Sequence, residues 1–303
     1  MAAPMNSAAT RLHQGHALPI AAIVAALIVV WYLGAIWLNS QRVIDGYEAD
    51  DALKSKWTTG DLVRDTLSMP RPVLPAPHQV VTELRRSVLD VAPTSNRSLI
   101  YHAYVTLSAA LVGFALGTLL GIALAIAIVH VATLERALLP LVIASQTVPI
   151  LAIAPMIIVV LGSIGLVGLL PKAFISAYLC FFPVTIGMVK GLTSPEPLQL
   201  DLIRTYSASR GQTFRKLRWP ASFPLLFPSL KIAVALAVVG AIVGELPTGA
   251  AAGLGARLLA GSYYGQTVQI WSALVLASLL AGLSVGIVGW VERLTLRHMG
   301  GRG

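Results

Sequence analysis

The strongest constraint in this chain is a set of long stretches that contain no Asp, Glu, Lys or Arg. They are residues 12–41, 98–134, 137–171, 173–189 and 258–291. A helix needs roughly 17–25 predominantly apolar residues to cross a bilayer. Only 12 % of the 303 residues are charged and 56 % are hydrophobic, whereas a soluble domain carries about 25 % charged residues. We therefore expect an all-α integral membrane protein.

These stretches predict five membrane-spanning helices, and a sixth apolar run is flanked by Lys231 and Glu245. The first span is too long for the apolar core of a secretory signal and lacks a small-residue cleavage site, so we expect an uncleaved anchor. Prolines should bend the third span at Pro140, Pro149 and Pro155. The six spans are expected at about 17–38, 103–129, 138–161, 171–190, 226–247 and 268–290.

Charge in the short loops predicts the orientation, because Lys and Arg accumulate on the cytoplasmic side. With the N-terminus inside, eleven basic residues of the short loops and ends are cytoplasmic, from Arg11 to Arg302. Only Lys172 and Arg257 fall in short outer loops. Both termini are therefore expected in the cytoplasm. The net charge of +9 indicates topology rather than a nucleic-acid partner.

The predicted organisation has four parts. Residues 1–38 form the cytoplasmic N-terminus and anchor helix, and residues 39–100 form an extracytoplasmic segment with eight basic and eight acidic residues. Residues 101–297 form the membrane domain, and 298–303 a cytoplasmic tail. Within the outer segment, apolar residues recur at helical spacing and predict a short amphipathic helix at the membrane surface: Val80, Val81, Leu84, Val88 and Leu89. Residues 39–69 have no explanation from the sequence.

Small residues at four-residue spacing predict helix contacts. Gly113, Gly117 and Gly121 form two overlapping GxxxG steps, and the pairs Gly240/Gly244 and Gly282/Gly286 repeat the spacing. Such spacing lets helix backbones approach closely in a membrane.

The sequence offers no catalytic residues. It has no Gly-Lys dipeptide and hence no phosphate-binding P-loop, and it has no HExxH string or paired carboxylates. No histidine pair has metal-ligand spacing near a Cys or carboxylate, so no metal is expected. The single cysteine, Cys180, lies in an apolar run and is expected to be a buried, inert thiol.

Two features could carry function. The first is the loop 190–224, where apolar residues flank a small polar segment and predict two short amphipathic helices on the cytoplasmic face. A solvated basic loop near anionic lipid is the alternative. The second is Glu245, because an ionisable residue near a membrane segment is a candidate functional site. The alternative is that Glu245 lies at the outer interface, where Pro247 ends the helix.

The loop resembles the EAA motif of binding-protein-dependent ABC importer permeases, which reads Glu-Ala-Ala, three residues, Gly, nine residues, Ile-x-Leu-Pro. The stretch DLIRTYSASRGQTFRKLRWPAS matches this spacing. Asp201, Ser207 and Trp219 depart from the consensus identities, although Asp keeps the charge and Ser a small residue at the bend. The matching positions, expected to couple to the ATPase, are Asp201, Leu202, Ile203, Ser207, Leu217, Trp219 and Pro220.

The resemblance extends over about residues 70–295. LPAPHQVVTEL, FFPVTIGMVKGL and the pair GELPTG and AGLGARLL are similar to segments of sulfonate/taurine/nitrate-type permeases. This family implies a type I ABC importer permease fold with six transmembrane helices and cytoplasmic coupling helices, in a bacterial inner membrane.

The family also implies partners. A separate cytoplasmic subunit would bind and use ATP, so this chain would bind no cofactor, and an extracytoplasmic binding protein would deliver substrate to a homodimer of permease chains. The substrate would be a small anion such as a sulfonate, taurine or nitrate, or a nitrogenous small molecule. Glu245 is a candidate for the gate or substrate path. One alternative is a proton-coupled secondary transporter in which Glu245 relays the proton. The other is a membrane enzyme or sensor, but the sequence contains no group of residues that would support it.

Overall fold

The computed structural model describes residues 17–50, 56–247 and 252–299, and every regular element in these ranges is a helix. This confirms the all-helical membrane fold. The chain forms two compact units: residues 1–86 with 261–272, and residues 87–260 with 273–303. Arg11 and Arg302 of the orientation argument, and the Thr-Gly that ends GELPTG, lie outside the described residues.

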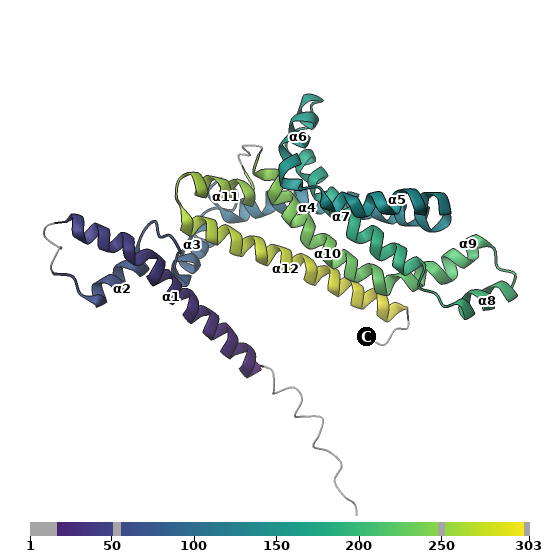
Figure 1. The fold of residues 1–303 in the computed structure, drawn as a ribbon, viewed down its shortest axis with the longest axis horizontal. Coiled ribbons are helices and arrows are strands. Elements are labelled where there is room, and N and C mark those ends of the chain that lie inside the picture. The colour runs from purple at the N-terminus through teal and green to yellow at the C-terminus, as the bar shows by residue number, and fades with distance from the viewer. Residues whose placement is uncertain (1–16, 51–55, 248–251, 300–303) are drawn as a thin grey trace, which may run out of the picture. The chain divides into compact units, whose positions relative to one another are not determined.

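Figure 1 labels the α-helices along the chain. The fourteen described elements are α1 (Ala17–Ala49), α2 (Thr59–Ser68), α3 (Pro77–Leu89), α4 (Leu99–His130), α5 (Ala132–Ala144), the 3₁₀ turn η1 (Ser145–Thr147), α6 (Ile150–Ser163), α7 (Leu169–Leu192), α8 (Pro197–Thr205), α9 (Arg210–Thr213), the π-helical turn η2 (Phe214–Arg218), α10 (Trp219–Glu245), α11 (Leu254–Tyr263) and α12 (Thr267–His298).

The first unit is organised around one face of α1. Ala35, Asn39, Val43 and Tyr47 follow one another at four-residue spacing and are all buried, which places them on one side of the helix. The Asn39 side chain donates to Leu74 O (2.9 Å) and accepts from Val73 N (2.7 Å). A buried amide thus satisfies the backbone of the proline-rich segment and fixes it against α1.

Further side-chain contacts hold this unit together. Trp31 Nε1 donates to Pro75 O at 3.0 Å, and the Trp31 ring packs on Trp271 with centroids 5.0 Å apart. Tyr47 donates to Asp65 of α2. Helix α2 begins at a capping box, in which Thr58 and Asp61 bond reciprocally.

The core of the second unit is formed by α4, α7 and α10, which lie side by side in Figure 1. Buried positions recur along α4 and include Ala109, Ala110, Ala125 and Ile128. Cys180 of α7 is buried in the same core. The exposed positions of these helices are mostly large and apolar, as expected for surfaces that face lipid.

The third predicted span is not a single bent helix. Helices α5 and α6 meet at 102° across a short break, and Pro149 is the residue that precedes α6. Tyr178 of α7 donates to Ser145 O at 2.6 Å and so holds the broken region. Pro140 and Pro155 lie inside the two helices. The described residues therefore contain five helices apolar and long enough to cross a membrane, or six if α5 and α6 count as one span.

Other boundaries also differ from the sequence expectation. Helix α1 continues to Ala49 rather than ending near residue 38, and α2 was not expected. The amphipathic helix predicted near Val80 is α3, with Val80 buried and Val81 exposed. The two short helices predicted in the 190–224 loop are unequal: α8 is separate, whereas α9 runs through η2 into α10 as one helix of 36 residues, Arg210–Glu245.

Candidate functional site

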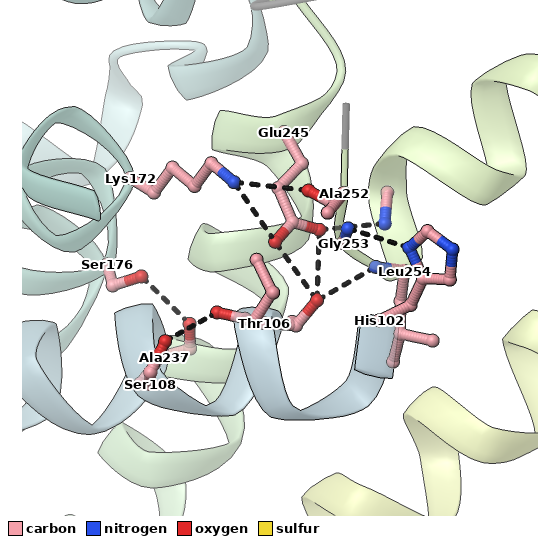
Figure 2. Close-up of polar contacts among 12 residues, drawn as sticks. His102, Thr106, Ser108, Lys172, Ser176, Ala237, Glu245, Ala252, Gly253 and Leu254 are labelled. Atoms are coloured by element: carbon pink, nitrogen blue, oxygen red, sulfur yellow. Dashed lines mark hydrogen bonds and ion pairs between the residues drawn. The ribbon is translucent and has the colours of Figure 1, made fainter. Parts of the chain in front are cut away.

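Glu245 ends α10 with a fully buried side chain (0 % exposed). Thr106 Oγ1 of α4 donates to both carboxylate oxygens at 3.0 Å, and Gly255 N donates to Oε2 at 2.8 Å. Lys172 Nζ of α7 lies 3.6 Å from Oε1. Three helices and the start of α11 thus converge on one carboxylate, as Figure 2 shows.

The backbone that enters α11 is held by three side chains in succession. Gly253 N donates to His102 Nδ1 (2.9 Å), Leu254 N donates to Thr106 Oγ1 (2.9 Å), and Gly255 N donates to Glu245. Lys172 Nζ donates to Ala252 O at 3.3 Å. First-turn amides of a helix have no partner within the helix, so this network, called here the Glu245 latch (His102, Thr106, Lys172, Glu245), satisfies the N-terminus of α11 inside the protein.

The geometry also fixes the state of His102. A backbone N–H can only donate, so Nδ1 accepts from Gly253, and Nε2 then carries the proton that it shares with Asn96 O at 2.9 Å. The imidazole in the latch is therefore the neutral Nε2–H tautomer.

Glycines let the backbone approach the carboxylate. Gly253 has φ +127°, and a Cβ built there would lie 2.2 Å from Glu245 Cδ. A Cβ at Gly255 would lie 2.4 Å from Ile242 O. The Gly-Leu-Gly sequence of residues 253–255 is thus required by close packing and by a left-handed backbone.

Glu245 is therefore buried and bonded rather than exposed at an interface. Lys172, which the charge count placed in an outer loop, is part of α7 and only 6 % exposed. Sequence reasoning missed Lys172, Thr106 and His102 as partners. One signal was present, because Lys172 is the single charge between two long uncharged stretches.

In the predicted coupling loop, α8 presents an uncovered apolar face. Leu198, Leu202 and Tyr206 are 77 %, 58 % and 78 % exposed. Asp201 is exposed and pairs with Arg204 at 3.1 Å, and Ile203 is half-buried. Helix α8 begins at a capping box between Glu196 and Gln199, with Pro197 in its first turn.

A sharp elbow follows α8. Ser207 has φ +51° and is the one non-glycine residue with positive φ in the described part of the chain. The consensus Gly of the EAA motif fits this left-handed conformation better than any residue with a Cβ. The position that the motif spacing assigns to a small residue is therefore the position where the chain turns, between α8 and Ser209, the N-cap of α9.

The end of the motif enters the membrane domain. Leu217 lies in η2, and Trp219 and Pro220 begin α10. Trp219 and Phe214 pack against the core, with ring centroids 5.8 Å apart. Pro220 lacks an N–H and its ring clashes with a regular preceding turn, and the wider π-helical turn directly before it accommodates this clash.

The glycines predicted to mediate helix contacts line α4 against α7. A Cβ at Gly113, Gly117 or Gly121 would lie within 3.0 Å of α7 atoms, and Gly240 and Gly244 of α10 also face α7. Gly282 and Gly286 differ, because no described atom lies within 4 Å of a Cβ built there. Among the described residues no three His, Cys, Asp or Glu side chains group as a metal site requires.

The family model described as "binding-protein-dependent transport system inner membrane component" matches residues 117–297. The chain belongs to this family of ABC importer permeases. The match covers η2, the latch residues Lys172 and Glu245, and the whole 190–224 loop. The family consists of membrane transport components, and the named relatives are transport permeases rather than enzymes.

This permease is similar to several named transport permeases. It is 33 % identical to the formylaminopyrimidine transport permease protein ThiX of Halalkalibacterium halodurans, over 50 % of this chain and 56 % of ThiX. It is 32 % identical to the riboflavin transport system permease protein RibX of Chloroflexus aurantiacus, over 74 % of this chain and 80 % of RibX. It is 25 % identical to the putative aliphatic sulfonates transport permease protein SsuC of Bacillus subtilis, over 74 % and 78 %. The match thus spans little more than half the length of ThiX.

Proposed function

We propose that this permease is the membrane-spanning subunit of an importer driven by a separate ATP-binding subunit. The exposed apolar face of α8 is the observation that carries the proposal. Leu198, Leu202 and Tyr206 recur every four residues and so form one exposed apolar patch, and contiguous patches of this kind mark interaction surfaces. The partner would be the cytoplasmic ATPase, which binds and uses the ATP. Both termini would then be cytoplasmic, and an outer binding protein would deliver substrate to a pair of permease chains.

For the substrate we propose a nitrogen-containing ring compound. ThiX and RibX, named for a formylaminopyrimidine and for riboflavin, are 33 % and 32 % identical to this chain, against 25 % for the sulfonate relative. Of the two substrate classes that the resemblance implied, small anions and nitrogenous small molecules, identity therefore favours the nitrogenous class. The test is binding of riboflavin, formylaminopyrimidine and taurine by the partner binding protein, since that protein delivers the substrate. Preference for taurine would contradict the proposal.

The coupling assignment is tested by altering the exposed face of α8. Asp201→Arg, Leu202→Asp and Ser207→Trp should leave the protein inserted in the membrane but reduce uptake in vesicles reconstituted with the ATPase and binding protein. The matched control is Leu202→Met, which keeps an apolar side chain. Normal co-purification of the ATPase together with full uptake by Leu202→Asp would contradict the assignment.

For Glu245 we propose a role in the outer gate, through the Glu245 latch. The residue is fully buried and clamped by the backbone at Gly253, which favours holding a conformation over direct contact with substrate. Glu245→Gln should alter uptake between pH 5 and 8, and normal uptake across that range would contradict the role. In the same vesicles, uptake that needs a proton gradient and no ATP would favour a secondary transporter instead.

A further inference from the structure

A pocket of about 360 Å³ lies on the inner side of α8, away from its exposed apolar face. Leu200 and Arg204 line it, whereas Leu198 and Leu202 point away, as residues two apart on a helix must. The opposite walls come from the last turn of α4, at Val129 and His130, and from α9 and η2. Pockets of this size, about 300–1,000 Å³, hold small ligands in other proteins.

The lining of this pocket is strongly basic. Arg204, Arg210 and Arg218 contribute three guanidinium groups, His130 an imidazole and Thr213 a hydroxyl, and no carboxylate lines it. Arg204 already pairs with Asp201, but in the described part of the chain Arg210 and Arg218 make no ion pair. Positive groups gathered in a hollow concentrate anions there. Guanidinium groups bind phosphate oxygens in pairs, which favours a phosphate over a simple halide.

The position of the pocket indicates which phosphate it takes. Val129 and His130 end α4, one of the helices apolar and long enough to cross a membrane, which places the pocket toward one membrane surface. Leu200 and Phe214 give it an apolar wall beside the charges. Basic pockets between membrane helices on the cytoplasmic side bind anionic headgroups.

We propose that this pocket, lined by His130, Arg204, Arg210 and Arg218, binds the phosphate of an anionic phospholipid. The lipid would lie between α8 and the end of α4 and stabilise the position of α8. The exposed apolar face of α8 would remain free. The cytoplasmic level of the pocket rests on the proposed function, whereas the binding itself is a property of this chain alone.

The chain offers a closely matched control. Arg210→Gln with Arg218→Gln removes two charges from the pocket, and Arg215→Gln with Lys216→Gln removes two charges from the same loop at exposed residues that do not line it. The probe is short-chain phosphatidylglycerol, titrated into the purified full-length permease without ATPase and followed by native mass spectrometry. Phosphatidylcholine of the same chain length is the neutral comparison.

We expect one saturable phosphatidylglycerol site, at least about tenfold tighter than phosphatidylcholine, that the pocket pair weakens about tenfold and the control pair leaves within about twofold. His130→Gln alone should weaken it less. Equal loss in both pairs, or equal binding of both lipids, would overturn the proposal. If millimolar inorganic phosphate displaces the lipid, the pocket is a site for free phosphate, and the proposal that it binds a phospholipid is overturned. Melting temperatures of all variants exclude unfolding. Failure of the lipid-binding test would not affect the coupling proposal that the α8 uptake variants test. Failure of the uptake test would likewise not affect the lipid-binding proposal.

Discussion

At the residue scale, Glu245 is a carboxylate whose neighbours are fixed by three helices. Its contacts reach Thr106, 139 residues earlier in the chain, and the amide of Gly255, ten residues later. Removing a charge from water is costly unless it is paired and hydrogen-bonded. The latch meets both conditions, because Lys172 supplies the charge and Thr106 and Gly255 supply donors.

The buried pair predicts a non-additive stability change. Glu245→Gln leaves the Lys172 ammonium buried without a counter-charge, which should destabilise the protein by about 3–5 kcal/mol. Lys172→Met should cost a similar amount, because the buried carboxylate keeps its donors Thr106 and Gly255 but loses its counter-charge. The double variant should be more stable than either single one, because no buried charge remains. Thermal unfolding of the purified permease measures all three, and purely additive losses would contradict the pairing.

The sequence indicated part of this site and not the rest. Glu245 was detectable because a charge in an apolar run is rare. Thr106 and His102 could not be detected as part of the site, because a single polar side chain in a long apolar helix has no spacing pattern that reveals its partner. At Ser207 the motif spacing located the turn, but the positive φ at a non-glycine residue required the structure.

At the element scale, the distance between packed helices decides where a glycine can be replaced by a larger residue. Gly117→Ala would bring a Cβ within 2.6 Å of Cys180 Cβ and 2.7 Å of Ala177 O. Such overpacking should cost about 1–3 kcal/mol. Gly282→Ala is the matched control, since it has open space among the described residues and alanine favours a helix by up to about 1 kcal/mol. Equal melting temperatures for the two variants would contradict the packing role of Gly117.

Helix α2 should depend on pH through its cap. The Thr58 hydroxyl and N–H donate to the Asp61 carboxylate at 2.7 and 2.9 Å, which holds the pKa of Asp61 below its usual value. The folded pKa lies below the unfolded value of about 3.9. The carboxylate therefore stabilises α2 above about pH 4, and this is lost as pH falls through the folded pKa.

Hydrogen exchange of the α2 amides checks this dependence. Asp61→Asn should lower their protection at pH 7, and the difference from the unaltered protein should shrink below about pH 4, after correction for intrinsic rates. Asp45→Asn removes a charge from the same unit without touching the cap and should have no effect on α2. A constant difference at all pH values would contradict the role of the carboxylate.

Most of the long apolar helices were predictable from charge-free runs, whereas helix ends and the short helix α2 were not. Helix α1 passes the expected end near residue 38 because Asn39, Val43 and Tyr47 continue its buried face. The sequence after residue 38 is too polar to resemble a membrane span, yet these three side chains are buried within the first unit. The α2 capping box, Thr58 with Asp61, was a signal that could have been used. The 102° break at Pro149 was visible only as an expected bend.

At the scale of the whole molecule, the chain has two packed units that should respond separately. Asn39→Leu leaves Leu74 O and Val73 N without their partner, which should destabilise the first unit by about 1–3 kcal/mol in total, since both bonds are part-buried. Exchange protection should fall in residues 56–86 and stay unchanged in α7. Combined with Gly117→Ala the losses should add, because the two sites share no partner residues. A combined loss well away from the sum would mean that the units are energetically coupled.

The helix Arg210–Glu245 joins the two candidate sites, because its first residue follows the elbow at Ser207 and its last is the latch carboxylate. Thirty-six residues at 1.5 Å each make a rod of about 54 Å. A tilt of about 5° around its midpoint would carry each end about 2 Å. Latch hydrogen bonds of 2.8–3.0 Å do not survive such a displacement. A small rotation imposed at the Ser207 end of this helix would therefore release the start of α11 at its other end.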